Sequence, residues 1–279
     1  MATTLNSSGE ILTLAKRASQ KELKKRYDAV AGRAAEYVRR EYPNLVGILL
    51  HGSVARGEPG PFSDIDIVGV VSHGKKPSEF SFFDEDIYVG VGFVSVEQLK
   101  KEFTDPKAFF WARGSAKATT VFYDPKGILK RIVAMWHGRR PSRQLLEKSL
   151  WDDYHNLIEY TGKLRNSWFY QDDYLTRYSA MIIAQRVERA VTAVNDLSII
   201  SENYLPRQVL GAKKKPTHLR TDYPIARGLK PTRRTQAVYQ AALRLCKETL
   251  RLIKNEFGNK AQHPRFRTLL TETLETHEL

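Results

Sequence analysis

Two aspartates and a glycine–serine pair lie close together in the segment 47–71, which reads GILLHGSVARGEPGPFSDIDIVGVV. An apolar run leads into Gly52 and Ser53, and Asp64 and Asp66 open a second apolar run. Alternate residues of a strand point to the same face, so the two carboxylates lie side by side. Carboxylates held together repel each other unless a cation lies between them. The spacing therefore predicts a magnesium site with a phosphate group beside it.

The loop between the two apolar runs has the composition of a phosphate-binding loop. A glycine such as Gly52 lets the backbone approach a phosphate closely. The guanidinium of Arg56, in the same loop, matches the geometry of phosphate oxygens. These properties are independent of the two aspartates and point to the same ligand.

The first half of the chain has the pattern of a small sheet flanked by helices. Apolar residues at helical spacing predict a helix over 20–42 that ends at Pro43. Alternating or β-favouring residues predict four strands, at about 46–51, 64–71, 86–94 and 118–123. Ser95, followed by a glutamate and a glutamine, predicts a capped helix start.

The second half has long helical periodicity. Helices are predicted at about 142–169, 173–200 and 235–257, which together make a helical bundle. The expected fold is of the α+β class, with a small mixed β-sheet domain over 1–140 and a C-terminal α-helical bundle over 141–279. The best boundary is near residue 140, where the periodicity changes.

The predicted helix 142–169 has one apolar and one polar stripe. The polar stripe contains residues that lie within about 80° of one another on an ideal helix: Asp152, His155, Glu159, Lys163 and Asn166. Such a stripe is either the solvent-facing side of an amphipathic helix or the wall of an active site. Periodicity alone favours the first explanation.

Composition places the chain among soluble, folded proteins. It has 279 residues, of which 42% are apolar and 27% charged. No run approaches the roughly 18 apolar residues of a membrane helix, and the N-terminal apolar stretch is too short for a signal-peptide core. A single cysteine, Cys246, excludes an internal disulfide framework. We expect a cytoplasmic protein with no membrane partner.

The formal net charge is +14, and part of it is concentrated in one segment. Residues 205–235 contain nine Lys or Arg against one acid, Asp222. Such a segment is either a solvated basic surface or an anion-binding surface for nucleic acid or a nucleotide. Few aromatic residues interleave the basic ones, which weakens the case for nucleic acid.

The spacing of Gly52-Ser53 from Asp64-Ile65-Asp66 resembles the signature of the nucleotidyltransferase superfamily of the DNA polymerase β type. Three longer motifs resemble the kanamycin nucleotidyltransferases, which pair a polymerase-β-like domain with a helical bundle. These motifs are GPFSDID (60–66), FYDPKGILKRI (122–132) and EYTGKLRN (159–166). The recognisable resemblance runs from about residue 20 to about residue 170.

The resemblance implies a role for each residue of the first motif. Gly52 and Ser53 would bind the nucleotide triphosphate through backbone N–H groups and a hydroxyl, and Arg56 would neutralise its charge. Asp64 and Asp66 would hold Mg²⁺.

The helix motif adds two further roles by resemblance. Glu159 lies where the family has its general base, and Lys163 lies where it has a contact to the triphosphate. The family's active site can be shared between two subunits, which implies a homodimer.

The superfamily places a third carboxylate on the strand after the Asp-x-Asp strand, and here the chain departs from it. A gapless match puts Gly90 at that position, and Asp86 lies four residues earlier, or about 13 Å along a strand. Either the register differs and Asp86 is the third metal ligand, or the site works with Asp64 and Asp66 plus water and the triphosphate.

The function implied is magnesium-dependent transfer of a nucleoside monophosphate from ATP or another NTP to a hydroxyl of a small acceptor, with release of pyrophosphate. An aminoglycoside, and hence antibiotic resistance, is the first expectation. Acids of the bundle are compatible with a cationic acceptor but do not select it: Asp152, Asp153, Glu159, Asp172, Asp173 and Asp196.

Three alternatives remain open. The first is a nucleotidyltransferase that acts on RNA, which the basic segment favours. The second is an enzyme that modifies a protein by AMPylation, since the spacing of the first motif also fits that group. The third is a non-catalytic nucleotide-binding protein, which the glycine at position 90 keeps open.

Overall fold

The computed structural model describes residues 20–258, 261–262, 264–268 and 270. The chain forms two compact units. The first contains the described residues up to Phe103 together with Arg113–Arg139, and the second contains Thr104–Ala112 together with the described residues from Arg140 onward. A short segment of the first half of the chain therefore belongs to the second unit.

A mixed five-stranded sheet, with the strand order β3-β4-β2-β1-β5, is the centre of the first unit. The strands are β1 (Gly47–His51), β2 (Ile65–Val71), β3 (Phe80–Asp84), β4 (Ile87–Ser95) and β5 (Thr120–Tyr123). β2 and β4 are parallel, and the other neighbours are antiparallel. The predicted α+β class is confirmed, although the edge strand β3 was not predicted.

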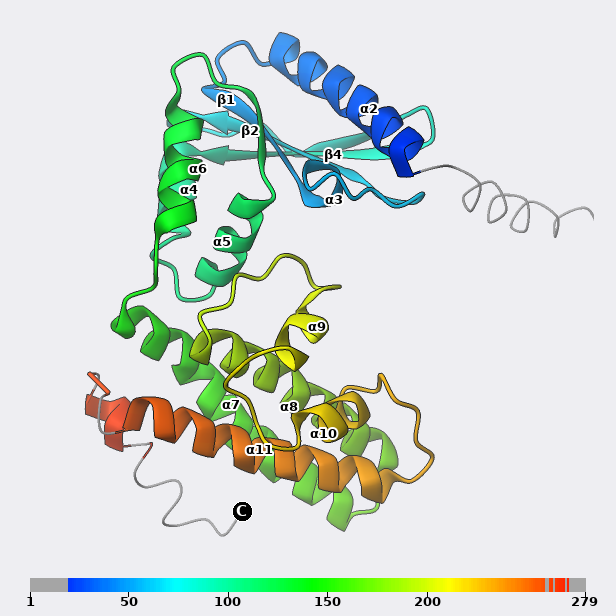
Figure 1. Ribbon diagram of the computed structural model, residues 1–279, viewed down its shortest axis with the longest axis vertical. Helices are drawn as coiled ribbons and strands as arrows, with labels where there is room; N and C mark the ends of the chain where they lie inside the picture. The colour runs from blue at the N-terminus through cyan, green and yellow to red at the C-terminus, as the bar shows by residue number, and fades with distance from the viewer. Residues whose placement is uncertain (1–19, 259–260, 263, 269, 271–279) are drawn as a thin grey trace, which may run out of the picture. The chain divides into compact units, whose positions relative to one another are not determined.

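Helix α2 (Gln20–Glu41) packs its apolar stripe on this sheet (Figure 1). Its buried residues recur at helical spacing and form one core with buried residues of the strands. Of the apolar residues at helical spacing, Leu23, Tyr27, Val30 and Ala34 are buried, whereas Tyr37 is 42% exposed. The predicted helix is confirmed to within one residue at its end.

Three shorter helices complete the first unit: α4 (Val96–Lys101), α5 (Phe109–Lys117), which continues from the second unit, and α6 (Ile128–Gly138). The predicted cap of α4 is confirmed, because the Ser95 hydroxyl accepts from the Gln98 backbone N–H and the Gln98 side chain accepts from the Ser95 N–H. The sequence did not predict α5 and α6.

The second unit is built on three long helices that pack on one another: α7 (Arg143–Phe169), α8 (Asp173–Val194) and α11 (Thr235–Phe257). Two short helices, α9 (Leu205–Leu210) and α10 (Leu219–Ala226), lie in the basic segment 205–235. The prediction for α8 extends six residues too far. The helix ends at Val194 because Asp196 adopts a φ of 52° and the Asn195 side chain bonds the backbone of Lys214.

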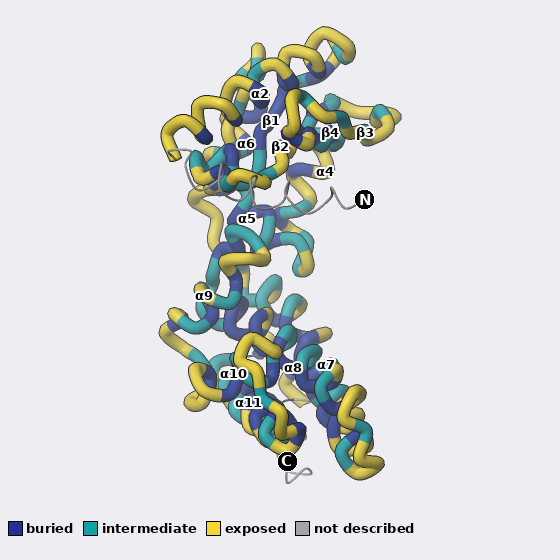
Figure 2. Tube along the Cα trace, turned by 90° about the vertical axis from the view of Figure 1, so that its right-hand side faces the viewer, coloured by how far each residue is buried: buried dark blue, intermediate teal, exposed yellow. Residues whose placement is uncertain are grey.

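Buried residues follow the facing sides of these helices, with exposed residues on their outer sides (Figure 2). The segment Thr104–Ala112 is tied to this unit by a hydrogen bond of 2.9 Å from the Ile199 N–H to the Phe110 carbonyl. None of the described helices is long and apolar enough to cross a membrane.

Candidate active site

The end of β1 places Gly52 against the carboxylate of Asp66. Gly52 begins the short helix α3 (Gly52–Ala55) with a φ of +76°, a left-handed conformation that favours glycine. A Cβ at this position would lie 2.6 Å from Oδ2 of Asp66. Backbone conformation and close approach therefore both require a glycine here. The antiparallel register pairs His51 with Asp66, which fixes this arrangement.

The loop from Ser53 to Asp64 folds back on its own beginning. The Ser53 and Ser63 hydroxyls lie 3.0 Å apart, and the Gly60 N–H donates to the Ser63 hydroxyl at 2.9 Å. The loop therefore places the Ser53 hydroxyl, which is expected to bind phosphate, next to Ser63, the residue that precedes Asp64. The structure brings Gly52, Ser53, Asp64 and Asp66 together, as the sequence predicted.

The two aspartates are exposed, whereas Ile65 and Ile67 are buried, so the predicted alternation along β2 is present. Although the residue as a whole is exposed, its carboxyl group is partly removed from water beside Gly52, and this desolvation, together with the negative charge of Asp64, raises the pKa of Asp66. Within the part of the chain that the structure describes, no lysine or arginine forms an ion pair with either aspartate. The pair is a local concentration of uncompensated negative charge.

The donor set suits a hard divalent cation that brings other ligands with it. Magnesium is commonly held by one or two carboxylates, with water and substrate phosphates completing its octahedron. Gly90 is the neighbour of Asp66 in the parallel register of β2 and β4, at the position where the superfamily has its third acid. The described residues contain no group of three or more His, Cys, Asp and Glu that could hold a metal. Asp64 and Asp66 therefore fit a metal that arrives with a triphosphate.

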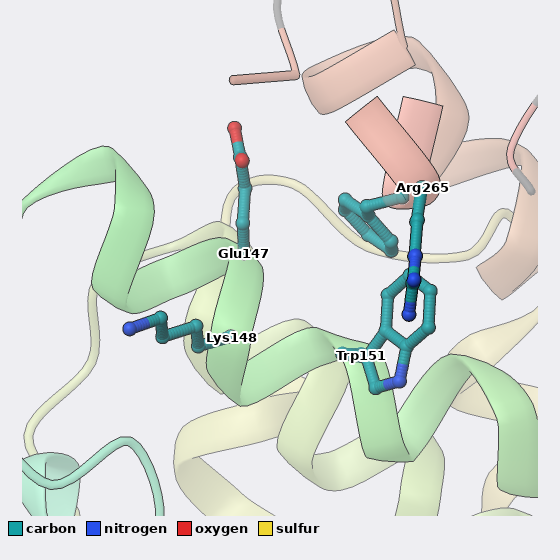
Figure 3. Close-up of a pocket in the computed structure, with 5 residues that line it drawn as sticks. Glu147, Lys148, Trp151 and Arg265 are labelled. Carbon is teal, nitrogen blue, oxygen red and sulfur yellow. The ribbon is translucent and has the colours of Figure 1, made fainter. Parts of the chain in front are cut away.

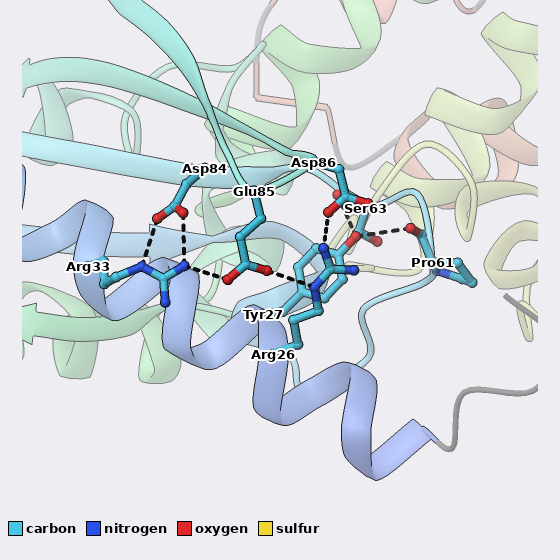
Figure 4. Close-up of polar contacts among 8 residues, drawn as sticks. All are labelled: Arg26, Tyr27, Arg33, Pro61, Ser63, Asp84, Glu85 and Asp86. Atoms are coloured by element: carbon cyan, nitrogen blue, oxygen red, sulfur yellow. Dashed lines mark hydrogen bonds and ion pairs between the residues drawn. The ribbon is translucent and has the colours of Figure 1, made fainter. Parts of the chain in front are cut away.

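Asp86, the candidate third ligand, lies apart from this pair. It belongs to the turn between β3 and β4, where three consecutive acids meet arginines of α2 (Figure 4). Asp86 pairs with Arg26, Asp84 accepts two hydrogen bonds of 2.9 Å from Arg33, and Glu85 pairs with both arginines. The register leaves Asp86 four residues before Gly90, so its role as a metal ligand stays a prediction without support from this geometry.

Tyr27 of α2 supports the loop, a role that the sequence did not reveal. Its hydroxyl lies 2.9 Å from the Ser63 carbonyl and 3.3 Å from the Pro61 carbonyl (Figure 4). Helical spacing identified Tyr27 only as a core residue. The contact joins residues more than thirty positions apart, and no local pattern signals it.

His51 was also missed as a neighbour of the candidate site. Burial lowers the pKa of its imidazole to about 4, so the ring is neutral near pH 7. The Thr119 hydroxyl lies 3.1 Å from its Nδ1. His51 is therefore an uncharged side chain next to the Gly52 turn.

Arg56 is largely covered, with 16% of its side chain exposed, and its Nε lies 3.5 Å from a carboxylate oxygen of Glu58. It lies in the expected loop, at the end of α3. Its predicted contact with a triphosphate remains a prediction.

In the second unit, Glu159 and Lys163 form an ion pair on the exposed face of α7. Their charged atoms are 2.6 Å apart, and 58% and 51% of the two side chains are exposed. The Glu159 carboxylate raises the pKa of the Lys163 ammonium, which also lies 4.4 Å from the centre of the Tyr160 ring. Exposed pairs of this spacing contribute little to stability, because water screens the two charges. Both groups can therefore separate to contact a substrate.

Comparison with known protein families matches both halves of the chain. Residues 32–108 match the family described as nucleotidyltransferase domain. Residues 153–255 match the family described as nucleotidyltransferase, substrate binding domain. The first match contains the Gly52 turn and both aspartates, and the second contains Glu159 and Lys163. The chain belongs to the nucleotidyltransferase superfamily.

This nucleotidyltransferase is also similar to one solved structure of low sequence identity. It is a nucleotidyltransferase-like protein from Exiguobacterium sibiricum 255-15, with 10% identity and a TM-score of 0.46. The likeness covers 82% of this chain and 78% of that one. No curated protein sequence matches the chain.

Two acids of the nucleotidyltransferase's second unit that are compatible with a cationic acceptor, Asp153 and Asp172, already have partners. The buried Asp153 carboxylate lies 3.1 Å from Arg186 and 4.0 Å from Arg189. Burial nonetheless raises the pKa of Asp153 to about 6. The Asp172 side chain caps α8 by accepting from the Leu175 N–H at 2.9 Å.

A small cavity of about 280 Å³ lies elsewhere on α7 of the nucleotidyltransferase (Figure 3). Glu147, Lys148 and Trp151 line it from α7, and Arg265 lines it from the end of the chain. Glu147 is buried and accepts hydrogen bonds from the Gln262 N–H at 2.9 and 3.0 Å. The Glu147 carboxylate therefore holds the Gln262 backbone against α7, and this contact stabilises the fold.

Proposed function

We propose that this nucleotidyltransferase moves a nucleoside monophosphate from ATP or another NTP to a hydroxyl group of a small acceptor. The observation that carries the proposal is the Gly52 turn, where a left-handed glycine, a serine hydroxyl and two carboxylates without cationic partners meet. The match of residues 153–255 to a substrate-binding family supports a separate acceptor site.

In the first unit, Gly52 and Ser53 bind triphosphate oxygens, and Arg56 offsets their charge. Asp64 and Asp66 would hold Mg²⁺, which when bound would supply charge screening and Lewis-acid polarisation at the α-phosphoryl group. Gly52, Ser53 and Arg56 keep the triphosphate in a fixed orientation, which is the main requirement of phosphoryl transfer.

In the second unit, Glu159 accepts the proton of the acceptor hydroxyl. The hydroxyl oxygen forms a bond to the α-phosphorus, and the bond from that phosphorus to the bridging oxygen of pyrophosphate breaks. Lys163 offsets the charge on the departing pyrophosphate. This requires Lys163 to leave Glu159, and the exposed, weak ion pair permits it.

The direct test is Glu159→Gln, assayed by pyrophosphate release with magnesium and each NTP against a panel of acceptors. Loss of a general base lowers turnover by about 10²–10⁴-fold. Glutamine retains the size of glutamate, and nucleotide affinity is expected to stay unchanged. Turnover within a few-fold of the wild type would remove Glu159 from the mechanism.

Glu256→Gln is the matched control, because Glu256 forms an ion pair with Lys214 at the same distance of 2.6 Å. Both variants lose an ion pair, and only Glu159→Gln also loses the proposed base. A fall in turnover that occurs in Glu159→Gln and not in Glu256→Gln therefore reports on catalysis.

The resemblance to kanamycin nucleotidyltransferases points to an aminoglycoside as the acceptor and to a cytoplasmic homodimer. Exposed aromatic side chains at the connection of α7 and α8 support a subunit contact, since Phe169 and Tyr170 are each 77% exposed and Tyr174 is 76% exposed. Light scattering at increasing protein concentration tests this, and a constant monomer mass would contradict it.

RNA is the second candidate acceptor, and the basic segment 205–235 favours it. Its one acid, Asp222, is buried and paired with Arg244 at 2.8 Å, so it offsets little of the surrounding charge. Binding of a short RNA whose affinity falls steeply with salt would support this function. No binding at low salt would exclude it.

A further inference from the structure

A polar cavity in the second unit lies between α7, α8 and the segment Thr104–Ala112. Its volume is about 580 Å³, which is the size of a site for a small molecule. Phe110, Trp111 and Ile199 give it an apolar wall. Its other walls carry charged and hydroxyl groups, four of them cations and three of them acids.

The cavity lies on the same stripe of α7 as Glu159. Asp152, a member of the polar stripe that contains Glu159, lines it together with Asn156, which lies one helical turn after Asp152. Asn156 precedes Glu159 by three residues, which is about 4.5 Å of helix. A ligand in this cavity therefore extends to within one helical turn of the proposed base.

The carboxylates of the cavity are already engaged. Asp153 is paired with Arg186, and Asp152 lies 3.5 Å from the Lys107 ammonium. The Asp105 side chain accepts from the Lys107 N–H at 2.9 Å. A polycationic ligand would have to compete with these cations for each acid.

The hydrogen-bond donors of the cavity are not all engaged. The Thr192 side chain is buried, at 1% exposure, and its hydroxyl has no partner among the described residues. The Nε of Arg186 is likewise buried and without a described partner. Both residues line the cavity from α8, together with the exposed Arg189. Buried polar atoms without partners are costly, and a ligand that accepts hydrogen bonds relieves that cost.

We propose that this cavity binds an oxyanion group, a carboxylate or a phosphate, of a small hydroxylated acceptor. The oxyanion accepts from Arg186 Nε and the Thr192 hydroxyl, while Lys148 and Arg189 offset its charge. The ring or carbon skeleton packs on Trp111 and places a hydroxyl toward Glu159. The identity of this ligand as the acceptor rests on the proposed function, but its binding does not.

The test is calorimetry on the full chain without nucleotide or metal, at constant ionic strength. The probes are gluconate and glucose 6-phosphate, which carry the two oxyanions, together with neutral glucose and polycationic kanamycin. At least one oxyanion probe is expected to bind about tenfold or more tighter than glucose, because charge-assisted hydrogen bonds are the strong ones. Comparison of the two oxyanion probes identifies the preferred group. Kanamycin binding tighter than both would overturn the proposal.

Thr192→Val is the sharpest variant. It replaces a hydroxyl without a partner by a methyl group of the same shape, so the Tm is expected to be equal or higher. Affinity for the oxyanion probe is expected to fall about tenfold. Unchanged affinity would show that the hydroxyl does not touch the ligand and would overturn the assignment.

The double variant Lys148→Gln/Arg189→Gln removes two exposed cations of the cavity and is expected to remain folded. Its matched control is Arg251→Gln, which removes an exposed arginine of α11 outside the cavity. Weaker binding in the double variant alone supports the site. Equal loss in both variants shows general charge attraction and overturns it.

The proposal and the proposed function fail in different ways. If an oxyanion binds in this cavity but no nucleotidyl transfer is detected, the proposed function is wrong and the proposed binding site stands. If kanamycin is modified and Thr192→Val does not change that transfer, the proposed binding site is wrong and the proposed function stands.

Discussion

The first unit contains two acidic clusters that look alike in sequence and differ in their surroundings. Asp84, Glu85 and Asp86 are held by Arg26 and Arg33 of α2. The pair Asp64 and Asp66 has no cationic partner among the described residues. A cluster whose charge is already compensated cannot attract a metal strongly, whereas an uncompensated pair can.

The two clusters also respond to pH in opposite directions. Arg33 and Arg26 lower the pKa of Asp84 and of Glu85, so these groups stabilise the fold above their unfolded-state pKa, and the contribution is lost as the pH falls. Burial raises the pKa of Asp66, so its contribution is present at low pH and is lost as the pH rises through its folded-state pKa. One cluster stabilises the folded chain near neutral pH, and the other costs stability there.

Asp66→Asn is expected to have the largest effect on turnover. Loss of a metal ligand costs several kcal/mol of transition-state stabilisation, which is a fall of about 10³-fold. The Tm without metal is expected to stay equal or to rise near neutral pH, because the variant removes a carboxylate that is unfavourable in the fold. Pyrophosphate release and calorimetry measure the two effects. A lower Tm with normal turnover would reverse the assignment of the two clusters.

Gly52→Ala is expected to reduce both stability and turnover. The left-handed conformation costs an alanine about 1–2 kcal/mol, and the new Cβ displaces the Asp66 carboxylate that lies 2.6 Å away. Displacement of about 1 Å in an active site lowers the rate by about 10²-fold. Gly74→Ala is the control, since Gly74 has a φ of +87° and no atom near its Cβ position. It shares the strain, and its turnover is expected to be normal.

Gly90→Asp is expected to strengthen metal binding by about tenfold, because a third carboxylate joins the uncompensated pair. The nearest atoms to the Cβ position of Gly90 are 4.0 Å away, so an aspartate fits. Titration with Mn²⁺ followed by electron paramagnetic resonance measures the affinity. Tyr88→Asp, at an exposed position two residues earlier on the same face, is the control. An equal gain in Mn²⁺ affinity in both variants would mean that any negative charge added to this strand strengthens metal binding.

Asp86→Asn is expected to have the smallest effect. Exposed ion pairs contribute about 0.2–1 kcal/mol, and turnover is expected to stay within about twofold of the wild type. Asp84→Asn is expected to reduce the loss of Tm between neutral and acidic pH, as followed by calorimetry. If Asp86→Asn lowers turnover as much as Asp66→Asn does, Asp86 is the third ligand and the comparison of the clusters is wrong.

Local patterns were sufficient for the central strands and the long helices. The alternation of Asp64, Ile65, Asp66 and Ile67 predicted which side chains of β2 are buried, because a strand with one covered face imposes that pattern. The edge strand β3 has no such pattern. Phe82 and Phe83 are consecutive, and Phe83 is 69% exposed, so its apolar residues do not alternate.

Pairings between distant residues could not be predicted from one sequence. Arg26 and Asp86 are sixty positions apart, and only the packing of α2 on the sheet brings them together. The same holds for Tyr27 and Ser63, and for Asp153 and Arg186. The motifs therefore predicted the nucleotide end of the proposed site, while the ion pairs of the acids in the second unit depend on contacts visible only in the fold.

The place of Thr104–Ala112 in the second unit has a consequence for synthesis of the chain on the ribosome. Phe110 is buried, and its carbonyl accepts from Ile199, which is translated 87 residues after Ala112. At about 5–20 residues per second, that interval lasts roughly 4–17 s. During this time the helices that complete the unit of this segment have not all been synthesised. The aromatic residues of the segment therefore lack their final packing partners, and slow translation of α7 and α8 lengthens that interval.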